Sequence, residues 1–96
     1  MELFIFARFY ARAGKEGAVE DAIRNVIPPS REEAGCISLN AVRSTRDAQL
    51  FYIHSRWVDE DAFELHAGLP HTVQFLERVQ PLIDHPLDVT RATVIV

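Results

Sequence analysis

The sequence predicts an α+β fold in which strands and helices follow one another in the order β-α-β-β-α-β. Three observations lead to this order. Residues 3–12 alternate with the period of two that is typical of a strand, and residues 15–27 repeat apolar side chains with the period of a helix. Two further strand-like segments, 36–46 and 49–57, are separated by a polar loop of hairpin length, which predicts that they pair as antiparallel neighbours.

The first predicted strand has two chemically different faces. One face suits a hydrophobic core beneath helices, and its members are Leu3, Ile5, Ala7, Phe9 and Ala11. The other face mixes aromatic rings with arginine, and its members are Phe4, Phe6, Arg8, Tyr10 and Arg12. Because a large exposed apolar patch on a small domain usually marks an interface, we expect a homodimer that pairs sheet to sheet.

The segment 15–27 carries the clearest helix pattern. Its apolar stripe consists of Val19, Ala22, Ile23, Val26 and Ile27. The proline pair at 28–29 is expected to break or kink this helix, because proline lacks an N–H and clashes with the preceding turn. Ser30 and Glu33 then have the spacing of a capping box, which predicts a further turn or two of helix.

The second half of the chain contains clear helix boundaries. Asp59 is a suitable N-cap residue, Gly68 is placed to end that helix, and Pro70 suits the first position of the next. The segment 87–96 alternates well enough to form a last strand. The complete order predicts the split βαβ arrangement of ferredoxin-like domains, with helices on one face of a four-stranded antiparallel sheet.

The bulk composition excludes several classes of protein. A chain of 96 residues has room for one hydrophobic core, so we expect a single domain over 1–96. The net charge is −4 and no basic run occurs, which argues against nucleic acid or an anionic membrane as the partner. There is no apolar segment near the ~18 residues of a membrane span, and no secretory signal pattern. With Cys36 as its only cysteine, the chain is expected to be a reduced cytoplasmic protein.

Aromatic and imidazole side chains concentrate in the segment 51–75, which holds three of the four histidines and the only tryptophan. His66 lies on the same predicted helix face as Phe63, where an imidazole could hold or move a proton near neutral pH. His71 lies at the start of the next helix, whose positive end favours a neutral ring. The alternatives are a buried His66 bonded to a backbone carbonyl and a His71 that faces solvent.

Four other residues of this segment are candidates for the wall of a substrate pocket. Trp57 could stack on a flat aromatic ligand and bond an oxygen through its N–H, although core packing would also explain it. Phe63 and Phe75 suit the core or the pocket wall. Ser55 shares the strand face of Trp57, and its small side chain would enlarge a pocket.

Neither a metal site nor a reactive thiol is expected from the spacing. His66 and His71 are five residues apart across a helix break, with no acidic or cysteine partner at ligand spacing. Cys36 has no basic neighbour in sequence that would activate it. The chain also lacks a Gly-rich phosphate loop and a dinucleotide fingerprint, so we expect no cofactor.

Several motifs in this order resemble a known family. They are Arg31 with Glu33-Ala34-Gly35-Cys36, Phe51-x-Ile53 leading to Trp57, Asp59-Glu60-x-Ala62, and His66-(x)3-Pro70-His71 with Phe75 beyond. Over essentially its whole length the chain resembles the antibiotic biosynthesis monooxygenase (ABM) domain, within the dimeric α+β barrel superfamily. The resemblance implies a sheet-to-sheet homodimer that forms an α+β barrel.

The resemblance also implies a function. It points to a monooxygenase that oxidises a small aromatic such as a quinol or polyphenol with dioxygen, without metal or flavin. His66 or His71 would then be the base. The haem-degrading branch of the fold needs an asparagine near the position of Ala7, and alanine cannot make that contact. A non-oxidative isomerase, or a protein that only binds a small ligand, is the alternative.

Overall fold

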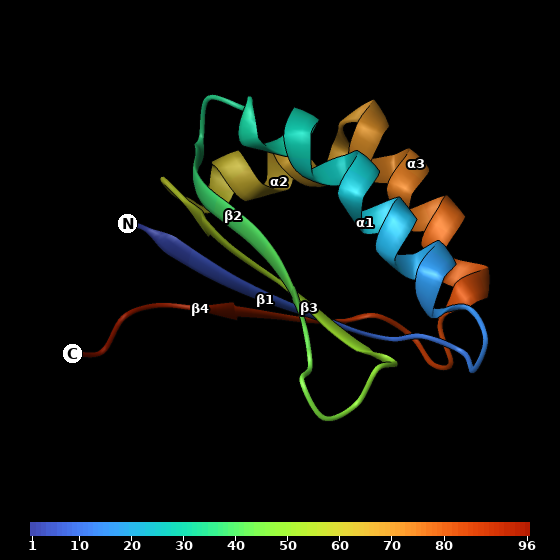
Figure 1. The fold of residues 1–96 in the computed structure, drawn as a ribbon. Coiled ribbons are helices and arrows are strands. Elements are labelled where there is room, and N and C mark those ends of the chain that lie inside the picture. The colour runs from blue at the N-terminus through green and yellow to red at the C-terminus, as the bar shows by residue number, and fades with distance from the viewer.

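The computed structural model describes residues 1–96 as a four-stranded antiparallel sheet with helices on one face (Figure 1). The elements in chain order are β1 (Leu3–Tyr10), α1 (Glu16–Arg31), β2 (Cys36–Arg43), β3 (Leu50–Trp57), α2 (Glu60–Gly68), α3 (Pro70–Val79), the 3₁₀ turn η1 (Gln80–Leu82) and β4 (Asp88–Ala92). The strands lie in the order β2-β3-β1-β4. The predicted ferredoxin-like α+β fold is confirmed.

The two faces of β1 differ in burial as its alternation predicts. Ala7 lies in the centre of the sheet, opposite Ile53 of β3 on one side and Val89 of β4 on the other. The side chains of β1 that face the helices are all buried, and they are Leu3, Ile5, Ala7 and Phe9. On the outer face Phe6 is 46% exposed, with its ring 4.8 Å from that of His54 between centroids. The helices all lie on the other side of the sheet (Figure 1), so these aromatic side chains lie on the face that no helix covers.

The proline pair does not break α1, contrary to the expectation from sequence. The helix continues through Pro28 and Pro29 and ends at Arg31. The carbonyl groups that lose their donors belong to residues four positions earlier, Arg24 and Asn25, and both residues are on the exposed side of the helix. Water can satisfy carbonyl groups there, so the missing hydrogen bonds cost little and the chain need not turn.

The capping box predicted from Ser30 and Glu33 is also absent. Ser30 lies inside the last turn of α1 and is 1% exposed, rather than preceding a new helix. The side chain of Glu33 bonds two distant histidines instead. The Ser-x-x-Glu spacing is present in the sequence, but the prediction that it marks the start of a helix is wrong.

Other boundaries agree more closely with the sequence. Asp59 caps α2 by accepting a hydrogen bond from the Ala62 N–H at 2.9 Å, while Gly68 is the last residue of α2 and Pro70 the first of α3. Strands β2 and β4 are shorter than predicted. None of the helices combines the length and apolar character needed to cross a membrane.

Candidate active site

A close approach between two segments brings the candidate site together. Gly35, in the connection from α1 to β2, lies so near Ala62 of α2 that a Cβ added to the glycine would overlap the alanine methyl. The Gly35 carbonyl also accepts a hydrogen bond from the Val58 N–H at 3.0 Å. Only glycine fits this contact, and the connection is thereby held against the start of α2.

The same connection delivers a carboxylate to two histidines. Glu33 Oε2 lies 2.8 Å from His66 Nδ1 on α2 and 2.7 Å from His71 Nε2 on α3. The Glu33 side chain is 11% exposed, so these contacts are shielded from solvent. A carboxylate in this position accepts N–H bonds from both rings, and it fixes which nitrogen of each ring carries the proton.

His66 is the more buried of the two histidines. Its side chain is 13% exposed, compared with 27% for His71. The indole ring of Trp57 lies 4.5 Å from the imidazole of His66 between centroids, and the ring of Phe63 lies at 5.7 Å. Thr72 Oγ1 is 3.4 Å from His66 Nδ1. With Nδ1 directed at Glu33, Nε2 is the nitrogen of His66 that no protein group engages.

His66 also lines a cavity of about 300 Å³ between the helices and the sheet. The wall combines side chains from all four strands, from α1, α2 and α3, and from the segment before β4. Its apolar members include Ile5, Phe9, Ile27, Leu39, Ile53, Phe63, Phe75 and Val89. Polar groups are few, and they are Ser30, Ser55, His66, Thr72 and Arg91. A largely apolar cavity with a few convergent polar groups is typical of a small-molecule site.

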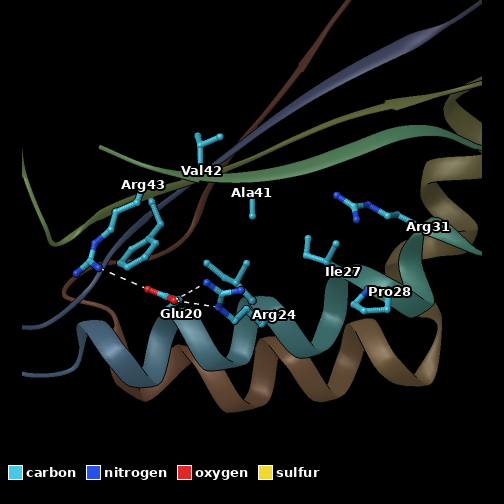
Figure 2. Close-up of a pocket in the computed structure, with 10 residues that line it drawn as sticks. Glu20, Arg24, Ile27, Pro28, Arg31, Ala41, Val42 and Arg43 are labelled. Atoms are coloured by element: carbon cyan, nitrogen blue, oxygen red, sulfur yellow. Dashed lines mark hydrogen bonds and ion pairs between the residues drawn. The ribbon is translucent and has the colours of Figure 1, made fainter. Parts of the chain in front are cut away.

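A larger cavity of about 480 Å³ lies elsewhere, in the groove between α1 and β2. Figure 2 shows its charged side chains, with Glu20 bonded to both Arg24 and Arg43. These side chains are 36–73% exposed, and the groove contains no histidine. The cavity beside His66 is therefore the better candidate for chemistry, although it is the smaller of the two.

The structure brings together some of the predicted site residues and separates others. His66, Phe63, Phe75 and Ser55 all line the 300 Å³ cavity. His71 does not line it, and instead lines a separate pocket of about 180 Å³ between α1 and α3, together with Gln74 and Arg78. His71 therefore reaches the candidate site only through Glu33.

Trp57 also lies outside the cavity wall, so its position agrees with core packing, the second of the two roles considered for it, rather than with stacking on a ligand in this cavity. Its side chain is fully buried, and its Nε1–H donates a hydrogen bond to Ser55 Oγ at 2.9 Å. The indole N–H is thus unavailable to a substrate oxygen. Trp57 packs behind His66 and supports the imidazole.

The expected lack of an acidic partner for the histidines is wrong. Glu33 is that partner, and one ligand atom from each of Glu33, His66 and His71 lies within 4.8 Å of the others, so these residues are the group that could hold a metal. The N···O distances of 2.7 and 2.8 Å are those of direct hydrogen bonds. The ring nitrogens that could bind a metal are therefore engaged in hydrogen bonds to the carboxylate.

Sequence reasoning missed Glu33 because 33 residues separate it from His66. The available signal was its place in the segment Glu33-Ala34-Gly35-Cys36, where a glycine follows a carboxylate at the end of a helix. Partial burial raises the pKa of the Cys36 thiol, and the nearby Glu33 carboxylate raises it further, which disfavours the thiolate form.

Comparison with known proteins settles the family. The sequence profile of "Antibiotic biosynthesis monooxygenase" matches residues 3–78, which include the two histidines and their carboxylate. The chain belongs to the antibiotic biosynthesis monooxygenase family. The resemblance seen in the sequence motifs is therefore confirmed.

Relatives of this ABM protein support the assignment. It is 29% identical over 86 residues to "Putative monooxygenase Rv0793" of Mycobacterium tuberculosis, covering 90% of this chain and 84% of the relative. The solved structure of Rv0793 has a TM-score of 0.94 at 25% identity, covering 99% of this chain and 96% of that one. PA3566 from Pseudomonas aeruginosa has a TM-score of 0.92 at 27% identity, with 99% and 95% covered. The chain is thus similar over nearly its whole length to a protein named as a putative monooxygenase.

Proposed function

We propose that this ABM protein is a monooxygenase that oxidises a small hydroxylated aromatic, of quinol or polyphenol type, with dioxygen and without metal or flavin. The observation that carries the proposal is the Glu33–His66 pair at the edge of an apolar cavity. The family membership supports the reaction class. The cavity wall, with Phe63 and Phe75, supports a flat apolar substrate.

The carboxylate makes His66 a suitable general base. When Nδ1–H donates to Glu33, the lone pair on Nε2 is free to accept a proton from a phenol. The positive charge that forms on the ring is then stabilised by the carboxylate at 2.8 Å. Trp57 and Phe63 pack on the ring and restrict its rotation, so the tautomer and the orientation are both fixed.

The proposed reaction combines a proton transfer, an electron transfer to dioxygen and the formation of a C–O bond. His66 takes the phenolic proton, and the phenolate passes one electron to dioxygen, which gives a phenoxyl radical and superoxide. The two radicals combine and form a C–O bond to a ring carbon that carries hydrogen. That ring hydrogen then leaves as a proton, its bonding electron pair forms the C=O bond, and the O–O bond breaks. The departing oxygen takes up this proton together with the one that His66 returns, and leaves as water. One hydroxyarene and one dioxygen thus give one quinone and one water.

The apolar cavity contributes by excluding water. A phenolate formed in a low-dielectric site interacts strongly with the imidazolium beside it, which favours proton transfer within the pair. Excluding water also keeps the radical pair together until it combines. Few lining groups other than His66 are polar, so the cavity offers little competition for the reacting oxygen.

Pairing of two copies through the exposed sheet face is part of the proposal. Phe6 and His54 form an aromatic contact on that face, and Arg56 lies over the ring of Phe4 at 5.3 Å. These groups lie on the side of the sheet opposite the helices, where a second copy would cover them. Burying such a surface is favourable, and the homodimer would close into the α+β barrel that the family resemblance implies.

A non-oxidative isomerase is the second candidate, because the Glu33–His66 pair would also move a proton next to a carbonyl. The two functions differ in the fate of oxygen. With ¹⁸O₂, the monooxygenase places one labelled atom in the quinone and one in water. An isomerase converts its substrate at the same rate without oxygen and incorporates no label, and that result would replace the proposed function.

A further inference from the structure

One hydroxyl group in the cavity wall has no partner. Ser30 lies in the last turn of α1 and is 1% exposed, yet its Oγ forms no hydrogen bond. Buried polar groups in folded proteins are nearly always bonded, so such an atom calls for an explanation. The only other buried side-chain atom without a partner is Arg56 Nε, on the opposite face of the sheet.

The two other hydroxyl groups in the wall already have neighbours. Ser55 Oγ accepts the hydrogen bond of the Trp57 indole, and Thr72 Oγ1 lies 3.4 Å from His66 Nδ1. Around Ser30, the cavity wall on α1 consists of the apolar side chains of Val26 and Ile27. The hydroxyl of Ser30 is therefore available to bond a molecule that enters this cavity.

Ser30 and the proposed base line the same cavity. Glu33, three residues further along the chain, holds His66 through its carboxylate. Ser30 on α1 and His66 on α2 thus belong to the same cavity and approach it from two different helices. A ligand of the cavity meets an imidazole from α2 and an unbonded hydroxyl from α1.

We propose that Ser30 is a specificity-determining residue, whose hydroxyl binds a second oxygen of an aromatic ligand that places its first hydroxyl at His66. The inference rests on the proposed function for the position of the first hydroxyl. A serine hydroxyl donates and accepts, so it bonds a phenol before oxidation and a carbonyl oxygen after it. The site therefore selects aromatic compounds with two oxygen functions over those with one.

Binding without oxygen tests this inference independently of turnover. The probes are 1-naphthol and a set of naphthalenediols that differ in the position of the second hydroxyl, titrated anaerobically by calorimetry. Wild-type protein is expected to bind at least one diol about tenfold more tightly than 1-naphthol, the contribution of one buried hydrogen bond. Ser30→Ala should remove that preference by weakening diol binding, with 1-naphthol binding unchanged.

Ser38→Ala is the matched control. Ser38 lies on β2 outside the cavity, so this substitution should leave the preference intact.

Thermal unfolding of the unliganded protein gives a second readout. Removing an unbonded buried hydroxyl should keep or raise the Tm, whereas loss of a serine with a structural role would lower it.

The inference would be overturned if the preference for a diol survived in Ser30→Ala. It would also be overturned if wild-type protein bound none of the probes or bound them all equally well. A lower Tm for unliganded Ser30→Ala would overturn it too. If wild-type protein takes up no oxygen but prefers a diol, and Ser30→Ala abolishes that preference, the inference is supported and the proposed function is rejected.

Discussion

Glu33 and His66 are 33 residues apart in the chain, and yet Glu33 Oε2 lies 2.8 Å from His66 Nδ1. The contact depends on the backbone, because Gly35 lets the connection after α1 lie against α2. A carboxylate that orients an imidazole beside an apolar cavity provides the means for proton transfer near neutral pH. The predictions below follow from this pair and from the exposed face of the sheet.

Replacing Glu33 by glutamine should lower kcat for phenol oxidation by about 10²-fold, with a much smaller change in KM. Glutamine keeps the size of the side chain but cannot stabilise the imidazolium by charge. Steady-state oxygen uptake measures the effect. Glu32→Gln, at the exposed neighbouring position, is the matched control and should match wild type. Activity of Glu33→Gln within twofold of wild type would exclude the carboxylate from the mechanism.

His66 and His71 should differ in their importance. His66→Ala removes the base and should lower kcat by ~10²–10⁴-fold, and added imidazole should restore part of the rate. His71→Ala should cost about tenfold, since His71 acts only by holding Glu33. His85→Ala, in an exposed turn, serves as the control. A larger loss in His71→Ala than in His66→Ala would show that the roles are reversed.

Gly35→Ala should destabilise the protein and lower its activity together. The new methyl would overlap the side chain of Ala62, and overpacking of this kind typically costs about 1–3 kcal/mol. The double variant Gly35→Ala with Ala62→Gly removes the overlap and should recover most of the loss. Chemical denaturation measures stability, and Gly17→Ala, which meets no atom within 4 Å, is the control. Additive losses in the double variant would contradict the proposed contact.

Substitution of Phe6 by aspartate should prevent pairing of two copies. Phe6 is 46% exposed on the free face of the sheet, and a buried charge at a sheet-to-sheet interface would be unpaired. Light scattering should give twice the chain mass of 10.9 kDa for wild type and a single chain for the variant. Leu65→Asp, at a position 68% exposed on α2, should remain a dimer. A wild-type protein that is a monomer at micromolar concentration would disprove the pairing.

The sequence alone predicts most of the fold, because the relevant signals are local. The alternation in residues 3–12 correctly assigns the buried face of β1, and Asp59 caps α2 as its residue type predicts. The error at Pro28 and Pro29 has a local cause as well. A helix tolerates proline when the carbonyl groups that lose their donors face water. The apolar stripe of this helix already puts Arg24 and Asn25 on its polar side, and the expected break gave this too little weight.

The candidate site was predictable only in part. His66 was identified because an imidazole on the apolar face of a helix could hold or move a proton near neutral pH. Glu33 was assigned to a capping box, because its spacing from Ser30 fits that motif and its contact with His66 is visible only after folding. For Trp57 the sequence left core packing and ligand stacking both open, since alternation places a residue on a face of the sheet without showing whether a cavity reaches it.

Oxygen consumption by metal-free protein tests the central claim most directly. Protein treated with EDTA and then freed of the chelator is mixed with a panel of quinols and polyphenols in an oxygen electrode. The account predicts uptake of one dioxygen per quinone formed, unchanged by the treatment and lower by about 10²-fold or more in His66→Ala. Activity that disappears on metal removal and returns with a divalent metal would contradict it, and would make Glu33, His66 and His71 metal ligands.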